Sequence, residues 1–234
     1  MAHQATSCDA IPLFGDVMPP KRNYGQFCSL ARALDLVGER WTLLIVRDLL
    51  AGPRRYKDLM DGLPGIGANL LAARLKHLEE TGLVKRSNPQ FANKAYMLTD
   101  TGRKLEPALV ALADWGQFLL EHPQGKDLWL AQWNHLALKA RFKAEKAAGL
   151  DEIYAFQIGD YAYYLWVTNG KLVTGEGRPP KFQCLITMEP EPFIKVFVDG
   201  SLELEEAMNS GLLELEGSQE AFQRCLGLFT GEGG

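Results

Sequence analysis

The chain has 234 residues, of which 47% are apolar and 23% charged, an ordinary balance for a globular protein with a sizeable core. Its four cysteines show no CxxC spacing and its four histidines are scattered, so neither a disulfide framework nor a metal cluster is predicted. The first twenty residues lack signal-peptide features, and no stretch approaches the roughly 20 apolar residues of a membrane span. We therefore expect a cytoplasmic protein without metal, cofactor or membrane contact.

The net charge of −4 is unevenly divided along the chain. Residues 21–120 hold 15 Lys and Arg against 10 Asp and Glu, whereas residues 121–234 hold 10 against 17. A basic half followed by an acidic half favours two domains with different partners.

Helical patterns dominate the first half of the chain, after an expected flexible arm over residues 1–23. Apolar spacings of three and four predict helices over residues 24–37, 41–52, 54–64 and 68–82. The segment 83–99 reads as two short strands around a turn. Thr99 or Asp100 is expected to cap a long helix that continues to about Leu120.

The sequence "EHPQGKD" (121–127) is the best linker, and an amphipathic helix over about 128–148 is expected after it. Strand-forming residues then dominate, and "YLWVTNGKLV" places Asn-Gly between two apolar runs, the strongest short-range hairpin signal. "FQCLITM" and "LLELEG" predict two further strands, with two helices between them. Ser218 is expected to cap a last helix that buries Phe222, Cys225, Leu226 and Phe229.

The helix predicted over residues 68–80 has two contrasting faces. At 100° per residue, Leu71, Leu75 and Leu78 share one stripe that must face a core. The opposite side is small and polar, which suits insertion of its N-terminal half into a DNA major groove. A simple surface helix is the alternative interpretation of the same pattern. The candidate DNA-facing residues on this helix are Ala68, Asn69, Ala72, Ala73, Arg74, Lys76 and His77.

Basic residues flank this helix on both sides. Arg54, Arg55 and Lys57 precede it, at the start of a short helix that would cross the DNA backbone. Lys85, Arg86 and Lys94 follow it, on a hairpin that would contact phosphates or enter the minor groove. Arg74 lies beside the apolar stripe, so bracing the fold and touching a phosphate are equally open roles for it.

Residues 28–116 resemble the HxlR-type winged helix-turn-helix regulators, through "GERWTLLIVRDLL", "GPRRYKDL", "LLAARLKHLEETGLV" and "YMLTDTGRKL". The resemblance implies a homodimeric regulator that uses its first helix and the long helix after the wing as the dimer interface. Some relatives use a thiol at the position of Cys28 to sense oxidants or electrophiles. The alternative for Cys28 is a small buried packing residue on the first helix.

The strand "YAYYLWV" (161–167) is apolar on both faces, so its second face should meet helices, the partner domain or an apolar ligand. The pattern from "NGKLVTGEG" to "CLGLF" resembles the sterol carrier protein-like fold, a small sheet with helices that can shelter a lipid-like molecule. The resemblance suggests a pocket for an apolar effector. The residues that would line it are Phe156, Tyr164, Trp166, Phe193, Phe197 and Phe222.

Neither half contains GxSxG, HExxH, a P-loop or a dinucleotide-binding turn, so an enzyme is not expected. The predicted fold is a mainly α winged helix-turn-helix domain (24–121) followed by an α+β domain with a small, mostly antiparallel sheet (122–234). The predicted function is sequence-specific DNA binding by a homodimer that acts as a repressor, with an apolar effector on the second domain. The alternative is an apolar-ligand carrier in which the winged helix serves mainly for assembly.

Overall fold

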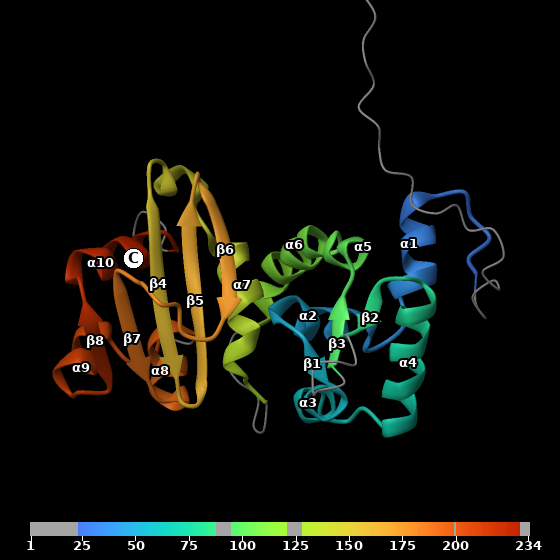
Figure 1. Ribbon diagram of the computed structural model, residues 1–234, viewed down its shortest axis with the longest axis horizontal. Coiled ribbons are helices and arrows are strands. Elements are labelled where there is room, and N and C mark those ends of the chain that lie inside the picture. The colour runs from blue at the N-terminus through green and yellow to red at the C-terminus, as the bar shows by residue number, and fades with distance from the viewer. Residues whose placement is uncertain (1–22, 88–94, 121–127, 199, 230–234) are drawn as a thin grey trace, which may run out of the picture.

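A computed structural model describes residues 23–87, 95–120, 128–198 and 200–229 of the chain. Its buried side chains form two separate clusters, one within the first half of the chain and one within the second. The protein therefore has two domains, each built around its own core, which lie side by side (Figure 1). The predicted fold class, a helical winged domain followed by an α+β domain, is confirmed.

The first domain is mainly helical and carries one small sheet (Figure 1). Its helices and strands, in chain order, are α1 (Ser29–Val37), α2 (Thr42–Ala51), β1 (Arg54–Arg55), α3 (Tyr56–Gly62), α4 (Ala68–Glu80), β2 (Val84–Arg86), β3 (Ala95–Leu98), α5 (Asp100–Arg103), α6 (Glu106–Gly116) and the 3-10 turn η1 (Gln117–Leu119).

Helix α1 begins later than its apolar spacing predicted, at Ser29 instead of near residue 24. Gly25 has a positive φ of 66°, and Cys28 is extended at the N-cap of the helix. The backbone N–H of Tyr24 donates to the Asp35 carboxylate at 3.0 Å, which ties the preceding segment back along the helix. The first helix is therefore short, and Cys28 lies at its N-terminus.

The long helix expected from Thr99 to Leu120 is interrupted. Thr99 caps α5 as predicted, because its side-chain oxygen accepts from the Gly102 N–H at 3.1 Å. Pro107 lacks the N–H that would bond the carbonyl of Arg103, four residues earlier, so α5 ends at Arg103 and α6 begins at Glu106.

The sheet of the first domain has the order β1-β3-β2. The strands β2 and β3 form the predicted wing hairpin, with Val84 opposite Leu98. The strand β1 was not predicted, since residues 54 and 55 were assigned to the next helix. It pairs with the wing strand, Arg54 opposite Tyr96, so the start of α3 is fastened to the wing.

The second domain is an α+β unit whose sheet has the order β6-β5-β4-β7-β8, parallel only between β4 and β7. Its elements are the 3-10 turn η2 (Ala131–Trp133), α7 (Asn134–Arg141), the 3-10 turn η3 (Ala144–Ala147), β4 (Asp151–Ile158), β5 (Tyr161–Thr168), β6 (Lys171–Glu176), β7 (Cys184–Met188), α8 (Pro190–Phe197), α9 (Leu204–Asn209), β8 (Leu213–Gly217) and α10 (Gln219–Gly227).

The β5–β6 hairpin is the one that Asn-Gly predicted. Thr168 pairs with Lys171, so the loop contains only Asn169 and Gly170. Both residues have positive φ, 50° and 70°, as a tight turn of this hand requires. Ser218 likewise caps α10 as predicted, accepting from the Ala221 N–H at 3.1 Å.

The connecting helix is shorter than expected from 128–148. α7 ends at Arg141, because Phe142 is extended and turns its ring toward Phe229 in the core of the second domain. Leu136 of α7 packs against the first core and Leu138 against the second. This short helix therefore joins the two domains through both of its flanks.

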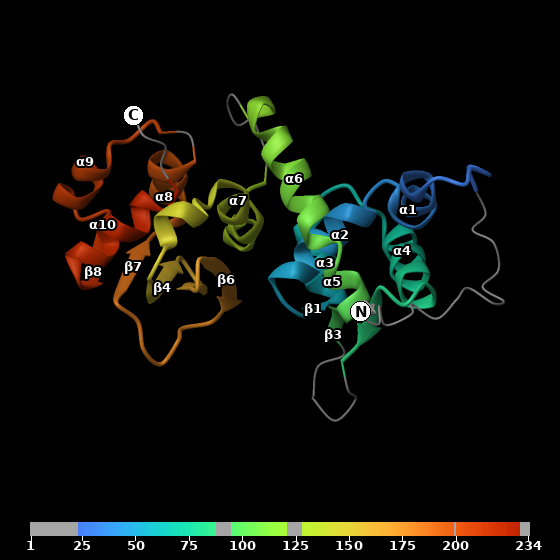
Figure 2. The same ribbon diagram turned by 90° about the horizontal axis from the view of Figure 1, so that it is seen from above.

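The helices of the second domain cover one face of its sheet, and the connection from β6 to β7 crosses the other face (Figure 2). No helix within the described ranges is long and apolar enough to span a bilayer.

Candidate nucleic-acid interface

Helix α4 presents the outward face that its sequence predicted. Leu71, Leu75 and Leu78 are at most 1% exposed and hold the helix against the first core. Its N-terminal half turns small residues to solvent, with one large apolar side chain among them, Leu70, which is 37% exposed and was missed from the sequence. The exposed candidate residues of this face are Ala68, Asn69, Ala72, Ala73 and Lys76.

The position of α4 leaves this face open. Both views place α4 at the end of the molecule that is remote from the second domain (Figures 1 and 2). At the C-terminal end of the face, the Lys76 ammonium lies 3.6 Å from the Glu80 carboxylate, four residues on. This pair offsets the charge of Glu80, which would otherwise repel phosphates.

Arg74 and His77 brace the helix, and we remove them from the set that would read bases. The Arg74 guanidinium donates to the Glu39 carboxylate at 2.8 Å and to the carbonyl of Arg40 at 3.4 Å. Nε2 of His77 lies 3.1 Å from the Leu36 carbonyl, which can only accept. His77 therefore fixes α4 against the last turn of α1, and Arg74 fixes it against the segment that links α1 and α2.

The short helix α3 carries the next basic residues. Arg55 and Lys57 are exposed at its start. The hydroxyl of Tyr56 donates to the Ala68 carbonyl at 2.7 Å, which ties the first turn of α3 to the first residue of α4. This bond fixes the start of α3, which carries the two exposed cations, next to the first residue of α4.

The prediction that Arg54 contacts a DNA phosphate does not agree with its position in the structure. It is 8% exposed, and its guanidinium pairs with the carboxylate of Glu176 in the second domain. A buried side chain that is already bound to a carboxylate cannot also contact DNA in this arrangement, so we withdraw that role. Side chains alternate between the two faces of β1, so Arg54 is buried and the next residue, Arg55, is exposed to solvent.

The wing adds a further basic group. Lys85 is exposed on β2. Arg86 is exposed as well, but its guanidinium donates to Glu79 at 2.9 Å and lies 5.2 Å from the Tyr96 ring centroid. Lys94 lies outside the described residues. Lys85 is therefore the wing cation best placed for a phosphate.

The boundary between the domains contains a chain of polar contacts that nothing in the sequence indicated. Glu176 accepts from both terminal nitrogens of Arg54 and from the hydroxyl of Tyr161 at 2.7 Å. Tyr161 in turn lies 3.0 Å from Nε2 of His135. Burial alone would raise the pKa of Glu176, but hydrogen bonds from Arg54 and Tyr161 outweigh it and hold the pKa below its ordinary value.

A second contact at this boundary involves Asp48 on α2. The indole N–H of Trp133 donates to its carboxylate at 2.9 Å, and the Arg47 guanidinium binds the same oxygen while lying 4.0 Å from the Trp133 ring centroid. Burial raises the pKa of Asp48 despite these donors. The two domains are thus held by charged groups that are largely withdrawn from water.

The six residues predicted to line one apolar pocket lie on two sides of the sheet. Phe156, Phe193 and Phe222 are at most 8% exposed, belong to the second core and have Phe197 packed against them. The sheet places Tyr164 and Trp166 on the other face, because side chains alternate along a strand and their neighbours Tyr163 and Leu165 are buried. A single pocket built from these six residues is therefore wrong.

The face of β5 that points away from the second core carries two aromatic side chains with defined contacts. The indole N–H of Trp166 donates to Asp151 at 2.8 Å, while its side chain remains 39% exposed. The ring of Tyr164 occupies the space above Gly175, where a Cβ atom would lie 2.3 Å from it. The Tyr164 ring can therefore pack directly over the backbone of Gly175, because glycine has no side chain that would clash with it.

Cys28 is exposed rather than buried, contrary to the packing alternative. The amides of Ala31 and Leu30 in the first turn of α1 lower the pKa of its thiol. Cys184 and Cys225 are buried, and burial raises the pKa of each thiol, to about 11 for Cys184. Among the described residues, no three His, Cys, Asp or Glu side chains form a group that could hold a metal ion.

Comparison with known proteins divides the chain at the same boundary. Residues 36–124 match the family model HxlR-like helix-turn-helix. An uncharacterized HTH-type transcriptional regulator of Mycobacterium tuberculosis is 44% identical over 106 residues, 44% of this chain and 65% of the relative. The regulator YvaP of Bacillus subtilis is 36% identical, over 40% of this chain and 89% of the relative. The regulator YodB of the same organism is 33% identical, over 46% of this chain and 90% of the relative. The chain thus spans slightly less than two thirds of the first of these relatives and most of the other two.

Residues 137–232 match the family model Alkyl sulfatase C-terminal. The solved structure of the sec-alkylsulfatase Pisa1 from Pseudomonas sp. is 22% identical, with a TM-score of 0.40 over 47% of this chain and 18% of that one. The structure of quinone-bound YodB from B. subtilis is 32% identical, with a TM-score of 0.34 over 38% of this chain and 96% of that one.

Proposed function

The chain belongs to the HxlR-like helix-turn-helix family through its first domain, and from that premise we propose that it is a cytoplasmic, sequence-specific DNA-binding regulator that represses transcription as a homodimer. The observation that carries the proposal is the open face of α4, with Asn69 and Lys76 turned to solvent at the end of the molecule remote from the second domain. A helix with such a face can enter the major groove with its first residues nearest the base edges.

The exposed cations around α4 support a division of labour. Asn69 and Lys76 would read bases, because the amide of Asn69 in the first turn of α4 and the ammonium of Lys76, two turns further on, can both bond base edges. Arg55, Lys57 and Lys85 would bind phosphates, which positions the protein without selecting a sequence. Arg54, Arg74 and His77 are engaged within the protein and have no part in this scheme.

Dimerisation is supported by large apolar side chains that a monomer leaves in water. Phe27 and Leu30 of the α1 region are 106% and 66% exposed, and Trp115 of α6 is 63% exposed. Burying one such side chain contributes roughly 1.5–3 kcal/mol, so a symmetric interface that covers both copies would be strongly favoured. Other exposed large hydrophobic residues near these positions are Tyr24, Leu34 and Leu112, and Phe118, Leu119 and Leu120 just after α6.

The second domain would make the regulator responsive to an apolar effector, as the sterol carrier-like pattern suggests. It has a continuous aromatic core and is fastened to the first domain by Arg54–Glu176 and Asp48–Trp133. A change in the second domain would therefore reach β1 and the wing strand with which β1 pairs. We propose no catalytic activity for it. Cys28, exposed at the start of α1, would add sensitivity to electrophiles.

The proposal is tested by selecting duplexes from a random pool with the full-length protein. Asn69→Ala and Lys76→Ala are expected to change the selected sequence, because each removes a hydrogen bond to a base, at a cost of about 1–3 kcal/mol. Lys85→Ala should weaken all duplexes alike, and Lys181→Ala, an exposed lysine of the second domain, should change nothing. No selection of any duplex by the unaltered protein would overturn the proposal and favour an apolar-ligand carrier.

A further inference from the structure

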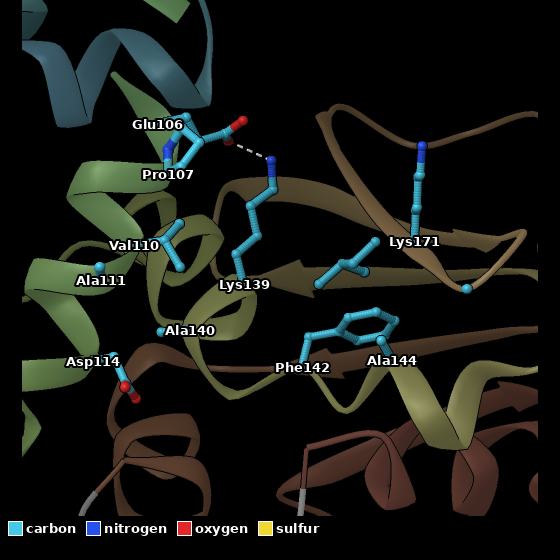
Figure 3. A pocket seen from close by; sticks show the side chains of 12 residues that line it. Glu106, Pro107, Val110, Ala111, Asp114, Lys139, Ala140, Phe142, Ala144 and Lys171 are labelled. Carbon is cyan, nitrogen blue, oxygen red and sulfur yellow. Dashed lines mark hydrogen bonds and ion pairs between the residues drawn. The ribbon is translucent and has the colours of Figure 1, made fainter. Parts of the chain in front are cut away.

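A groove lies between the two domains, and its walls come from both. One wall is α6, and the other consists of the end of α7, the segment leading into η3, and the β5–β6 turn (Figure 3). The groove has a volume of about 550 Å³ and is broadly open to solvent. This volume lies within the range of roughly 300–1,000 Å³ that is usual for small-molecule sites.

The surface of the groove is mainly apolar. Val110 and Ala111 form the wall on α6, and Ala140 and Phe142 lie on the facing wall (Figure 3). Leu172 of β6 also lines the groove. Phe142 is in place because the chain leaves the helical conformation after Arg141. The same break that shortens α7 therefore supplies an aromatic side chain to the groove.

The charged groups of the groove cancel one another. Glu106 of α6 and Lys139 of α7 form an ion pair between the two walls (Figure 3). Asp114 and Lys171, the other two charged residues of the lining, carry opposite signs. A ligand with a net charge would gain no net attraction here and would lose hydration, whereas an uncharged apolar molecule would lose little.

Helix α6 connects the groove with other parts of the protein. Leu109 is 5% exposed and packs in the first core, whereas Val110 faces the groove. Leu112 and Trp115 are exposed on the surface that we assign to the dimer interface. A molecule that touches both walls binds best to one relative placement of α6 and the second domain. It therefore shifts the equilibrium toward that placement by the difference between its binding free energies for that placement and for the others.

We propose that this groove, rather than the interior of the second domain, is the effector site, and that its ligand is an uncharged apolar or aromatic molecule whose binding changes DNA affinity. The inference rests on the proposed function for its consequence, but the binding site stands on the groove alone. The aromatic residues expected from the sequence to enclose a ligand are instead packed in the second core or placed on the far face of the sheet.

The test uses the full-length protein and two probes that share one ring skeleton. N-phenyl-1-naphthylamine is uncharged, and 1-anilinonaphthalene-8-sulfonate adds a sulfonate; the fluorescence of both rises on binding. We expect the uncharged probe to bind more tightly, by about fivefold or more. Ala111→Trp and Ala144→Trp, which would fill the groove from opposite walls, should weaken the uncharged probe by about tenfold or more.

Ala148→Trp is the matched control for Ala144→Trp. Both alanines are exposed, and they lie at the two ends of the same short segment, but only Ala144 lines the groove. The control should keep the affinity of the unaltered protein. Equal probe affinity in all three variants, or tighter binding of the sulfonate, would overturn the site.

The regulatory half of the inference is measured separately, on a duplex selected by the protein itself. Saturating uncharged probe should change the affinity for that duplex by about fivefold or more in the unaltered protein and in Ala148→Trp, but not in Ala144→Trp. Probe that binds in the groove without changing DNA affinity would overturn the coupling. Absence of DNA binding with an intact probe site would instead overturn the proposed function.

Discussion

The guanidinium of Arg54 and the carboxylate of Glu176 are paired across the boundary between the domains, although 122 positions separate them in the sequence. Arg54 belongs to β1, which pairs with the wing strand, and Glu176 ends the edge strand β6. The pair therefore links the edge of the second sheet directly to the wing of the first domain.

Glu176→Gln should destabilise the protein, because it leaves the buried Arg54 charge without a counter-charge. Loss of one partner of a fully buried pair costs about 3–5 kcal/mol, and we expect about 2 kcal/mol because the Glu176 side chain remains 30% exposed. Urea unfolding at pH 7 measures the loss. The matched control is Glu216→Gln, in an exposed pair with Arg178, which should cost less than about 1 kcal/mol. Equal losses in the two variants would contradict the assigned role of Glu176.

His135 should make stability fall as the solution is acidified. Burial lowers the pKa of its imidazole from 6.5 to about 4, while Glu176 opposes and Lys139 and Arg54 reinforce the change. Between these pH values the unfolded chain binds a proton that the folded protein does not, so stability is lost from pH 6.5 downward. The complete loss is roughly 3 kcal/mol.

Unfolding free energies at pH 7 and pH 5 check this expectation against His135→Gln. The variant should lose less stability than the unaltered protein between the two pH values, by about 2 kcal/mol. Since all other titrating groups are shared, the difference isolates His135. Parallel losses would show that the imidazole is not held neutral.

The apolar surface of α6 should be covered in solution. Trp115→Glu would place a charge within the assigned interface and is expected to convert dimers to monomers in sedimentation velocity. Trp166→Glu also replaces an exposed tryptophan, but on the sheet of the second domain. It should leave the dimer intact, and a dimer that survives Trp115→Glu would place the interface elsewhere.

Cys28 should be alkylated before the buried cysteines. Its thiol is exposed and its pKa is lowered by the first turn of α1, whereas burial raises the pKa of Cys184 and Cys225. In a Cys8→Ser background at about pH 7.5, iodoacetamide followed by peptide mass mapping should label Cys28 first. The other two should react only after urea unfolds the protein, and equal labelling in the folded state would contradict this placement.

Local signals were sufficient for much of the fold. Asn169 and Gly170 specify a two-residue turn by their own backbone preferences, and Ser218 and Thr99 cap helices by bonds to residues three positions on. The buried stripe of α4 follows from spacing alone. Each of these features depends on neighbours in the chain, so one sequence suffices to predict it.

Features that depend on distant partners were missed or misplaced. The basic character of Arg54 suggested a phosphate, and only the packing of the second domain shows that its partner is Glu176. Phe156 and Tyr164 are both aromatic and close in sequence, but they lie on opposite faces of one sheet. The candidate groove could not be foreseen, because its walls come from separate parts of the chain and meet only when the domains dock.

The salt dependence of DNA affinity tests the central claim most directly. The measurement is the dissociation constant of the full-length protein for a selected duplex between about 50 and 200 mM salt. If a dimer makes about six phosphate contacts, affinity should fall roughly 10³-fold across that range. Lys85→Ala should lower the slope of log affinity against log salt by about one for each copy that contacts DNA, and Lys181→Ala should leave it unchanged. An affinity that stays flat from about 50 to 200 mM salt would contradict DNA binding through the α4 face and the wing.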